Sequence, residues 1–446
     1  MISTRTPLPQ ARPGSQIDYE LFLDCVHCGL CTSACPTYVE LGTEMDSPRG
    51  RIYLMRGVVD GKLPLDDQVR RHIDLCLDCR ACETACPSGV QYGKLLEPFR
   101  HDLEAQRPKP AWPWWMRLLL FRVMTSARRA RWAVAPARLM ERLGLLAWLR
   151  RPGLLRRMPP TLRTLATLLP PLPPRGPELP ESLPAVGKLR ARVALFTGCV
   201  NDALFHHVNW ATARVLQQNG CEVWTPRQQV CCGAIHYHAG QARPAVDLAN
   251  QNATVFGQAP FPLDAVVVNV AGCGSLLKDY AHVLPDAGGA GARFAAKVRD
   301  VHEFLAELGP VPPTHPLSMR AVYHDACHLC HAQRIRQQPR DLLRLIPGLE
   351  LVSTAEAELC CGAAGSYNLV QPEMADRLGQ RKAEQISAAA PDAVLTANAG
   401  CLLQVRRHLE ALGQRPWIAH PMEALWASYS GTTPPLGTGV KSFEAR

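Results

Sequence analysis

The pattern of apolar and polar residues changes character near residue 190. From Arg190 onward, short apolar runs such as Val193–Phe196 and Ala265–Val270 alternate with stretches of helical periodicity such as Ala203–Gln218. This alternation predicts an α/β fold for the C-terminal half of the chain.

The α/β part is an internal duplication. Each copy has one cysteine, then a Cys-Cys-Gly triplet, then a cysteine in an Ala-Gly-Cys sequence, and the corresponding spacings differ by one residue. The cysteines are Cys199, Cys231, Cys232 and Cys273 in the first copy and Cys327, Cys360, Cys361 and Cys401 in the second. Each copy closes with a short strand and a helix, at Val301–Leu308 and Ile418–Trp426.

A cysteine-free segment, residues 107–190, precedes the duplication. Arg107–Arg163 holds fourteen Lys/Arg and one acid, so it carries +13 where the whole chain carries +10. The density of proline in Pro170–Pro184 excludes a helix or a sheet and predicts an extended linker. We therefore divide the chain into four regions: residues 1–106, 107–190, 191–312 and 313–446.

Eighteen cysteines in this chain require an explanation. Met1–Gln16 lacks the apolar core of a secretory signal, and no run approaches the eighteen apolar residues of a membrane-spanning helix. We expect a cytoplasmic protein, where stable disulfides are rare and grouped cysteines more often bind metal.

One cysteine motif occurs twice in the N-terminal region. It runs from Cys25 through Cys28 and Cys31 to Cys35-Pro36, and again from Cys76 through Cys79 and Cys82 to Cys86-Pro87. Three closely spaced thiolates hold three irons of a [4Fe–4S] cube, and the fourth cysteine ligates the other cube. The spacing thus predicts two [4Fe–4S] clusters, one held by Cys25, Cys28, Cys31 and Cys86 and the other by Cys76, Cys79, Cys82 and Cys35. Zinc sites and disulfide frameworks rarely show this spacing with a trailing proline.

Between the two motifs, Asp46-Ser47-Pro48 has the form of a helix start. The apolar residues that follow predict a helical insertion packed over the clusters. Arg49 and Arg51 on this helix are candidates for contact with an acidic partner.

The cysteines of the duplicated part follow strand-like runs, and ligands of open α/β sheets bind beyond the carboxyl ends of strands. We expect each set of four to meet in one crevice and to hold a second cofactor, either a further Fe–S cluster or zinc, or to serve thiol redox chemistry. Cys221 is interpreted as a packing residue, whereas Cys330 is a candidate additional ligand. Five histidines near the crevices are candidates for handling protons or contacting a quinone: His236, His238, His324, His328 and His331.

The basic segment interleaves its arginines with tryptophans, among them Trp114, Trp132 and Trp148. Basic amphipathic helices of this kind lie on anionic lipid or dock on a partner subunit. We expect no nucleic-acid partner, because no recognition motif accompanies the charge. The chain also lacks a dinucleotide fingerprint or a phosphate loop, so a flavin would have to bind another subunit, which leaves no catalytic residue here.

Several of these sequences resemble the glycolate oxidase iron–sulfur subunit family. The resemblance is carried by Val26–Cys31, Cys35–Tyr38, Asp46–Leu54 and Cys86–Tyr92, and by the two Cys-Cys-Gly copies, which are also similar to those of heterodisulfide reductases. It implies a helical two-cluster ferredoxin-like domain followed by a duplicated α/β cysteine-rich (CCG) domain. It further implies FAD-binding partner subunits that oxidise glycolate to glyoxylate and a quinone acceptor. The complex would lie peripherally on the cytoplasmic face of the inner membrane, with residues 107–163 as the contact.

Two departures from the related domains stand out. Leu276 and Gln404 occupy the place of a last cysteine, which disfavours a five-thiolate cluster, and Asp325 stands where a cysteine is common. Other functions stay open at this stage. They are the iron–sulfur subunit of a D-lactate or glycerol-3-phosphate dehydrogenase, a thiol–disulfide reductase that uses the paired cysteines directly, and a metal-stabilised scaffold that binds nucleic acid.

Overall fold

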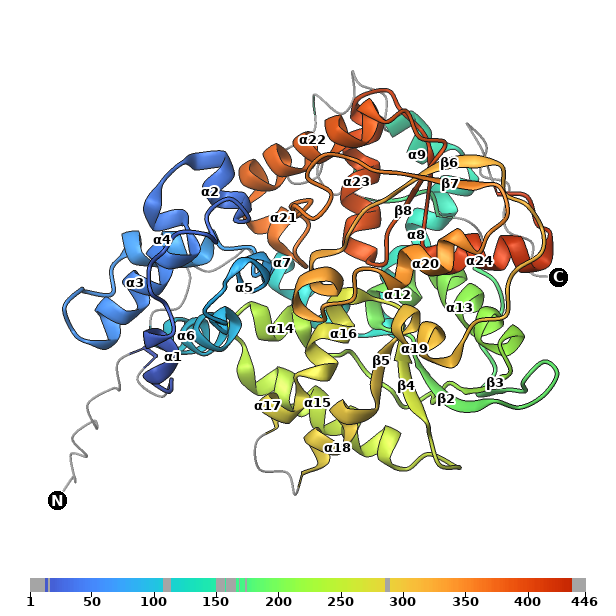
Figure 1. Ribbon diagram of the computed structural model, residues 1–446, viewed down its shortest axis with the longest axis horizontal. Coiled ribbons are helices and arrows are strands. Elements are labelled where there is room, and N and C mark those ends of the chain that lie inside the picture. The colour runs from blue at the N-terminus through green and yellow to red at the C-terminus, as the bar shows by residue number, and fades with distance from the viewer. Residues whose placement is uncertain are drawn as a thin grey trace.

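The structure is a computed structural model of the 446-residue chain. It describes residues 13–14, 17–106, 114–149, 157, 166–167, 169–172, 175–284 and 289–434. A helical N-terminal domain lies at one end of the molecule, against two α/β units that we call the first lobe (residues 191–312) and the second lobe (residues 313–434) (Figure 1). The mixed architecture confirms the predicted fold class.

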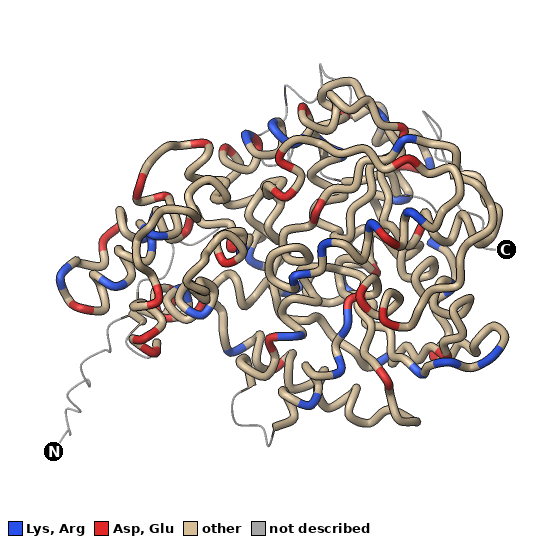
Figure 2. The backbone as a smooth tube through the Cα atoms, viewed as in Figure 1, with Lys and Arg blue, Asp and Glu red and all other residues tan. Residues whose placement is uncertain are grey.

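The N-terminal domain is built of short helices around one apolar core. The predicted helix start is confirmed, because the Ser47 side chain accepts a hydrogen bond from the Gly50 amide at 3.0 Å and Pro48 begins the helix. The core joins α3 to α6 through residues such as Met55 and Phe99, both fully buried. The elements are α1 (Glu20–Leu23), α2 (Pro36–Leu41), η1 (Glu44–Asp46), α3 (Pro48–Val59), α4 (Asp67–Asp74), α5 (Ala81–Ala85) and α6 (Tyr92–Gln106). Acidic and basic residues are interspersed along this domain (Figure 2).

Each lobe contains a parallel sheet with the same strand order. The first lobe has the order β3-β2-β4-β5 and the second has β7-β6-β8-β9, so both follow the local order second, first, third, fourth. Their strands are β2 (Ala191–Phe196), β3 (Cys221–Trp224), β4 (Ala265–Val268), β5 (Val298–Asp300), β6 (Met319–Tyr323), β7 (Leu349–Val352), β8 (Ala393–Leu395) and β9 (Trp417–Ala419). The duplication seen in the cysteine pattern is thus a duplication of the fold.

Helices surround both sheets, and in the described residues the first lobe has two more of them than the second. Those of the first lobe are α12 (Cys199–Leu204), α13 (His206–Gln218), α14 (Ala234–His238), α15 (Ala242–Gly257), α16 (Ala271–Lys278), α17 (Tyr280–Val283), α18 (Ala290–Lys297) and α19 (Val301–Leu308). Those of the second are η3 (His328–Ala332), α20 (Gln338–Arg344), α21 (Tyr367–Val370), α22 (Pro372–Ala388), α23 (Ala399–Ala411) and α24 (Pro421–Ser430). Each lobe closes with a strand and a helix as predicted, although in the first lobe the strand is Val298–Asp300 and all of Val301–Leu308 is helix. The closing helices α19 and α24 both begin with a capping box.

The segment between the N-terminal domain and the lobes is partly helical where it is described. It contains α7 (Trp114–Leu118), the π-helix η2 (Leu119–Val123), α8 (Ala127–Arg142) and α9 (Leu145–Leu149). Helix α8 packs on α12, where Arg131 Nε lies 3.0 Å from an Asp202 oxygen. Residues 107–113, 150–156 and 158–163 of the predicted basic segment lie outside the described residues. No helix in the described ranges is both long and apolar enough to cross a membrane.

The proline-rich stretch differs from the expectation at one point. Ser182–Leu183 form the strand β1, which pairs antiparallel with β3 at the edge of the first sheet. The exclusion of sheet structure was therefore wrong for these two residues. Proline is tolerated beside an edge strand, because only one side of such a strand needs its amides for pairing.

The N-terminal domain contacts both lobes. Against the first lobe, the His101 ring donates to the Tyr237 carbonyl at 3.1 Å. Against the second lobe, the Tyr367 hydroxyl donates to the Leu75 carbonyl at 2.9 Å, and Arg381 pairs with Glu40 at 3.0 Å. These contacts place the second cysteine motif beside the second lobe.

Candidate metal centres

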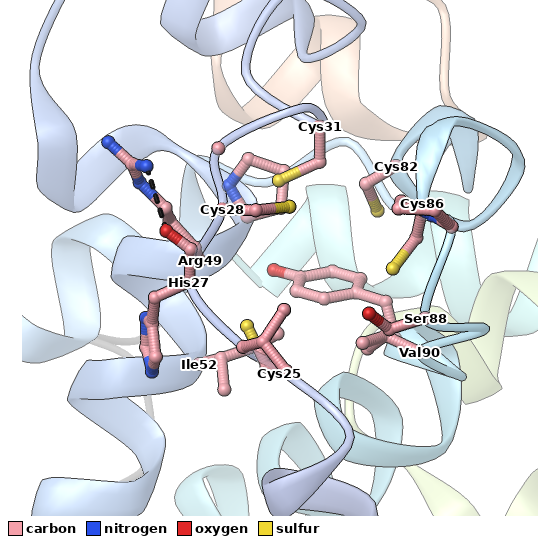
Figure 3. Close-up of a pocket in the computed structure, with 15 residues that line it drawn as sticks. Cys25, His27, Cys28, Cys31, Arg49, Ile52, Cys82, Cys86, Ser88 and Val90 are labelled. Atoms are coloured by element: carbon pink, nitrogen blue, oxygen red, sulfur yellow. Dashed lines mark hydrogen bonds between the residues drawn. The ribbon is translucent and has the colours of Figure 1, made fainter.

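The first pocket of the N-terminal domain, which we call pocket 1, gathers one of the predicted sets of four thiols. Cys25, Cys28 and Cys31 line it from one loop, and Cys86 joins them from the end of α5. Figure 3 shows these sulfur atoms around a common space, with Cys82 at its edge. The pocket encloses about 410 Å³ of empty volume, part of it open to solvent.

The adjoining pocket, pocket 2, gathers the other set. Cys76, Cys79 and Cys82 line it together with Cys35, which caps the start of α2. Cys82 also lines pocket 1, so the two spaces share a wall. The fourth cysteine of each motif thus lies in the pocket of the other motif, as the spacing predicted.

The two cysteine loops have the same backbone shape. The residues before the second cysteine, His27 and Asp78, both have φ of 55°, and the residues after it, Gly29 and Arg80, have φ of 86° and 61°. Left-handed conformation at both places curls the loop so that its three thiols face one side. Arg80 adopts it without being glycine, at a cost of about 1–2 kcal/mol, and ion pairs hold its guanidinium.

Buried charge surrounds pocket 2. The Arg51 side chain, which is 1% exposed, donates to the His72 carbonyl at 2.6 Å and to Thr37 Oγ1 at 3.0 Å. Its Nη1 atom lies 3.9 Å from Cys35 Sγ. Because Arg51 is buried, the expectation that it meets an acidic partner is wrong. Arg49 instead pairs with Glu44 at 2.6 Å on the rim of pocket 1, and donates to the His27 carbonyl (Figure 3).

Burial alters the acidity of the thiols in both pockets. It raises the pKa of Cys31 to about 11 and those of Cys79 and Cys82 well above their ordinary value. Thiolate ligands must lose their protons when a metal binds, so a thiophilic cation would have to displace these protons. Four converging thiols with few oxygen donors fit such a cation and do not fit a hard one.

The lobes bring their cysteines together as expected, at the carboxyl ends of the parallel strands. In the first lobe Cys199 Sγ lies 3.3 Å from Cys231 Sγ, and Cys232 contacts Cys273. In the second lobe the Cys361 and Cys401 sulfurs are 3.4 Å apart, and those of Cys360 and Cys327 are 3.9 Å apart.

Comparison with known proteins agrees with this arrangement. Residues 22–90 match the family described as "4Fe-4S dicluster domain", and residues 193–278 and 321–406 match "Cysteine-rich domain". A "Probable glycolate oxidase iron-sulfur subunit" of Bacillus subtilis is 39% identical over 407 residues, which cover 89% of this chain and 91% of that protein. The chain belongs to the glycolate oxidase iron–sulfur subunit family.

Two further relatives are similar to this chain, one along most of its length and the other over about half of it. The "Glycolate oxidase iron-sulfur subunit" of Escherichia coli is 33% identical, with 90% of this chain and 93% of that protein covered. "Lactate utilization protein A" of Geobacillus kaustophilus is 31% identical and covers 52% of this chain and 98% of that protein. Together with the family matches, these relatives support an iron–sulfur electron-transfer subunit.

The five predicted histidines lie in three different settings. His238, His328 and His331 bridge the N-terminal domain and the lobes: His328 Nε2 donates to the Asp78 carbonyl at 2.9 Å, and Thr84 contacts His331 at 3.0 Å. His236 stacks on Phe121 of η2. His324 alone of the five faces crevice thiols, those of Cys361 and Cys401.

The two remaining cysteines of the lobes, Cys221 and Cys330, are both buried. Cys221 is fully buried in the apolar core between the sheets, in agreement with a packing role. Cys330 is also fully buried, and its sulfur lies 3.8 Å from the Cys327 carbonyl oxygen. Burial raises the pKa of both thiols.

Sequence reasoning missed the charge network beside pocket 2. Asp78 and Glu97 contact the His238 ring at 3.2 and 3.0 Å, and Arg80 pairs with both carboxylates. It also missed that Cys79 packs in one apolar cluster with Cys360 and Cys327 of the second lobe. The charged residues inside the two Cys-x-x-Cys spacings of the second motif, Asp78 and Arg80, were the available signal, and they do not reveal a partner in another domain.

Proposed function

We propose that this chain is the iron–sulfur electron-transfer subunit of an FAD-dependent glycolate oxidase complex, which converts glycolate to glyoxylate. The observation that carries the proposal is the pair of adjoining pockets, each lined by one predicted set of four thiols. The substrate and FAD would bind partner subunits, because the sequence shows no nucleotide fingerprint. No catalytic residue is assigned to this chain.

Pocket 1 would hold one [4Fe–4S] cluster through Cys25, Cys28, Cys31 and Cys86. Pocket 2 would hold the other through Cys76, Cys79, Cys82 and Cys35. When bound, such clusters take up and release single electrons. The crevices of the lobes would hold a further Fe–S cluster or zinc through Cys199, Cys231, Cys232 and Cys273 and through Cys327, Cys360, Cys361 and Cys401.

The residues around pocket 2 support this role through charge and hydrogen bonding. The Arg51 guanidinium supplies a buried positive charge, and the Asp78 amide and the Tyr92 hydroxyl donate to Cys76 Sγ at 3.4 and 3.6 Å. Donors and cations at thiolate sulfur favour the more negative, reduced state of a metal site. They would therefore raise the reduction potential of a cluster bound in pocket 2.

We infer that the flavoprotein docks over the rim of pocket 1. Cys28 is exposed there, and Val26, Leu30 and Tyr53 around it are 68%, 59% and 59% exposed. Pocket 2 instead adjoins the second lobe, where Cys79 packs in one apolar cluster with Cys360. An apolar rim beside an open site is suited to docking a protein surface.

The exposed tryptophans of the intermediate segment support a peripheral contact with the cytoplasmic face of the inner membrane, where a quinone would accept the electrons. Trp114 and Trp132 are 76% and 74% exposed, and Trp148 is 51% exposed. Helix α8 packs on α12 while its Trp132 stays exposed, so this side chain is free to meet lipid or a partner subunit.

A second candidate is the iron–sulfur subunit of a D-lactate dehydrogenase, which the likeness of half the chain to "Lactate utilization protein A" favours. The deciding experiment purifies the complex anaerobically and measures iron, sulfide and FAD, then assays glycolate, D-lactate and glycerol 3-phosphate with a quinone analogue. We expect about eight irons from the two pockets and turnover of glycolate.

The matched variants are Cys28→Ser in pocket 1 and Cys221→Ser in the core. We expect the first to lose about four irons and quinone reduction, and the second to keep both. An iron-free complex, or full quinone reduction by Cys28→Ser, would disprove the relay. Turnover of D-lactate in place of glycolate would show that the second candidate, the iron–sulfur subunit of a D-lactate dehydrogenase, is correct.

A further inference from the structure

The two lobes share a fold but differ at two positions that border their cysteines. Val193 of β2 pairs with Ala265 at the start of β4, and Ala321 of β6 pairs with Ala393 at the start of β8. Counting from these equivalent residues, Phe196 of the first lobe corresponds to His324 of the second. Both stand three residues before the first cysteine of their lobe.

The second difference lies at the start of the helix that carries the last cysteine. Val270 is the N-cap residue of α16, and Asn398 is the N-cap residue of α23. The Asn398 amide nitrogen lies 3.5 Å from Cys401 Sγ, and its oxygen accepts from the Gly272 amide at 3.3 Å. Two apolar residues in the first lobe are thus replaced by two polar residues in the second.

His324 is buried without a conventional partner. The residue is 2% exposed, and neither ring nitrogen has a nitrogen or oxygen hydrogen-bond partner among the residues that the structure describes, whereas the ring interacts with the Cys361 thiol. Burying a polar group without a partner costs about 1–3 kcal/mol, so each such group calls for an explanation. The ring instead faces sulfur, because one nitrogen lies within 4.8 Å of both Cys361 Sγ and Cys401 Sγ.

The spacing of these donors fits a single ion. Zinc binds thiolate at about 2.3 Å and imidazole at about 2.0 Å in a tetrahedron, so its ligand atoms lie within about 4 Å of one another. The Cys361 and Cys401 sulfurs, 3.4 Å apart, have this spacing, and a His324 ring nitrogen lies within 4.8 Å of both. Ligands of a cubane cluster bind different irons and spread around it.

We propose that His324 is a direct ligand of one thiophilic divalent cation, of the zinc class, in the second lobe. Cys361 and Cys401 are the two thiol ligands that the structure brings together with it. Asn398 is a positioning residue that donates to Cys401 Sγ. The inference deepens the proposed function, since it takes these thiols as metal ligands, but it does not depend on the clusters of the N-terminal pockets.

The site has a consequence for the relay. Zinc undergoes no redox change, so the second lobe would brace the wall of pocket 2, where Cys360 packs against Cys79, and would not act as an electron carrier. The first lobe has phenylalanine at the equivalent place, and its metal would have only thiolate ligands.

The test replaces His324 by phenylalanine, the residue at the equivalent place in the first lobe, and separately by cysteine. The full chain, purified anaerobically with its clusters, is compared with His324→Phe and His324→Cys for zinc and iron content. After removal of zinc, Co²⁺ is added and its visible absorption is recorded, because the bands depend on the ratio of nitrogen to sulfur ligands. His408→Phe, which alters another partly buried histidine of the same lobe, is the control.

We expect His324→Phe to bind zinc at least about tenfold more weakly at this site. We expect His324→Cys to keep the metal and to shift the cobalt bands towards those of an all-thiolate site. A His324→Phe protein with full zinc and an unchanged cobalt spectrum would overturn the proposal. So would additional iron and sulfide in the second lobe, beyond the N-terminal complement, in place of zinc.

Two outcomes separate this inference from the proposed function. If the purified full chain contains zinc but no iron, the result would refute the electron relay and support the zinc site. If His324→Phe fails to fold, His324→Cys decides the question, because a merely structural histidine would leave cobalt bands unmoved when it is replaced by a thiol.

Discussion

Arg51 offers a direct test of how the protein sets the reduction potential of a cluster bound in pocket 2. Its buried guanidinium reaches to 3.9 Å from Cys35 Sγ. At about 4 Å and an effective dielectric constant of about 20, two unit charges interact by about 4 kcal/mol. For one electron this corresponds to about 170 mV, at about 59 mV per 1.4 kcal/mol.

Two features of the structure reduce this figure. An electron added to a metal site is shared over its atoms, and the Asp46 carboxylate, 3.6 Å from Arg51 Nη2, opposes the guanidinium. We therefore expect Arg51→Leu to lower the potential by roughly half of that value, about 80 mV. The direction follows because a cation stabilises the reduced, more negative state.

The assay is a redox titration of the anaerobic protein followed by electron paramagnetic resonance. Arg51→Lys keeps the charge and should shift the potential by less than half as much. Arg56→Leu alters an exposed arginine of the same helix and should leave the potential unchanged. Removing one partner of a buried ion pair costs about 3–5 kcal/mol, so Arg51→Leu is also made with Asp46→Asn to preserve folding. An unchanged or higher potential in Arg51→Leu at full iron content would refute the electrostatic reasoning.

Three other predictions concern the interface, the surface and the thiols. Burial lowers the pKa of His238, but contacts with Asp78 and Glu97 outweigh burial and raise it to about 9. Its stabilisation is complete below about pH 6.5 and is lost as pH rises through about 9, so the melting temperature should fall over this range in the wild type and change less in His238→Gln. Trp132→Ser should weaken binding to anionic vesicles or to the partner subunit in a sedimentation assay, and no change in either would contradict the assignment of this surface. Cys79→Ser should lose about four irons by elemental analysis, and retention of full iron content would exclude Cys79 as a ligand.

The features that depend on local spacing were predictable from the sequence. Cysteines two or three residues apart share one loop whatever the rest of the chain does, so the two motifs predicted two converging sets of thiols. The duplicated Cys-Cys-Gly pattern likewise predicted two crevices, and the structure confirms a repeated strand order. The start of α3 at Pro48 was predictable for the same reason, because a helix cap is a contact within one turn.

The features that depend on packing between distant segments were not predictable. Arg51 had the sequence context of a surface residue, and only the packing of α3 on α4 and α6 buries it. The expectation of an extended linker also missed β1, because an edge strand forms only where another strand is already present to pair with it.

The sequence by itself determined which residues form each set of thiols and how many times the α/β unit occurs. Tertiary structure decided what surrounds those thiols: that pocket 2 adjoins the second lobe, that a guanidinium lies beside Cys35, and that a histidine faces Cys361 and Cys401. The physical reason is that a thiol's neighbours along the chain are set by covalent spacing, whereas its charge and polar environment comes from residues outside that spacing, such as Arg51 for Cys35 and His324 for Cys361. Those residues reach the thiol only when apolar burial folds the separate segments together.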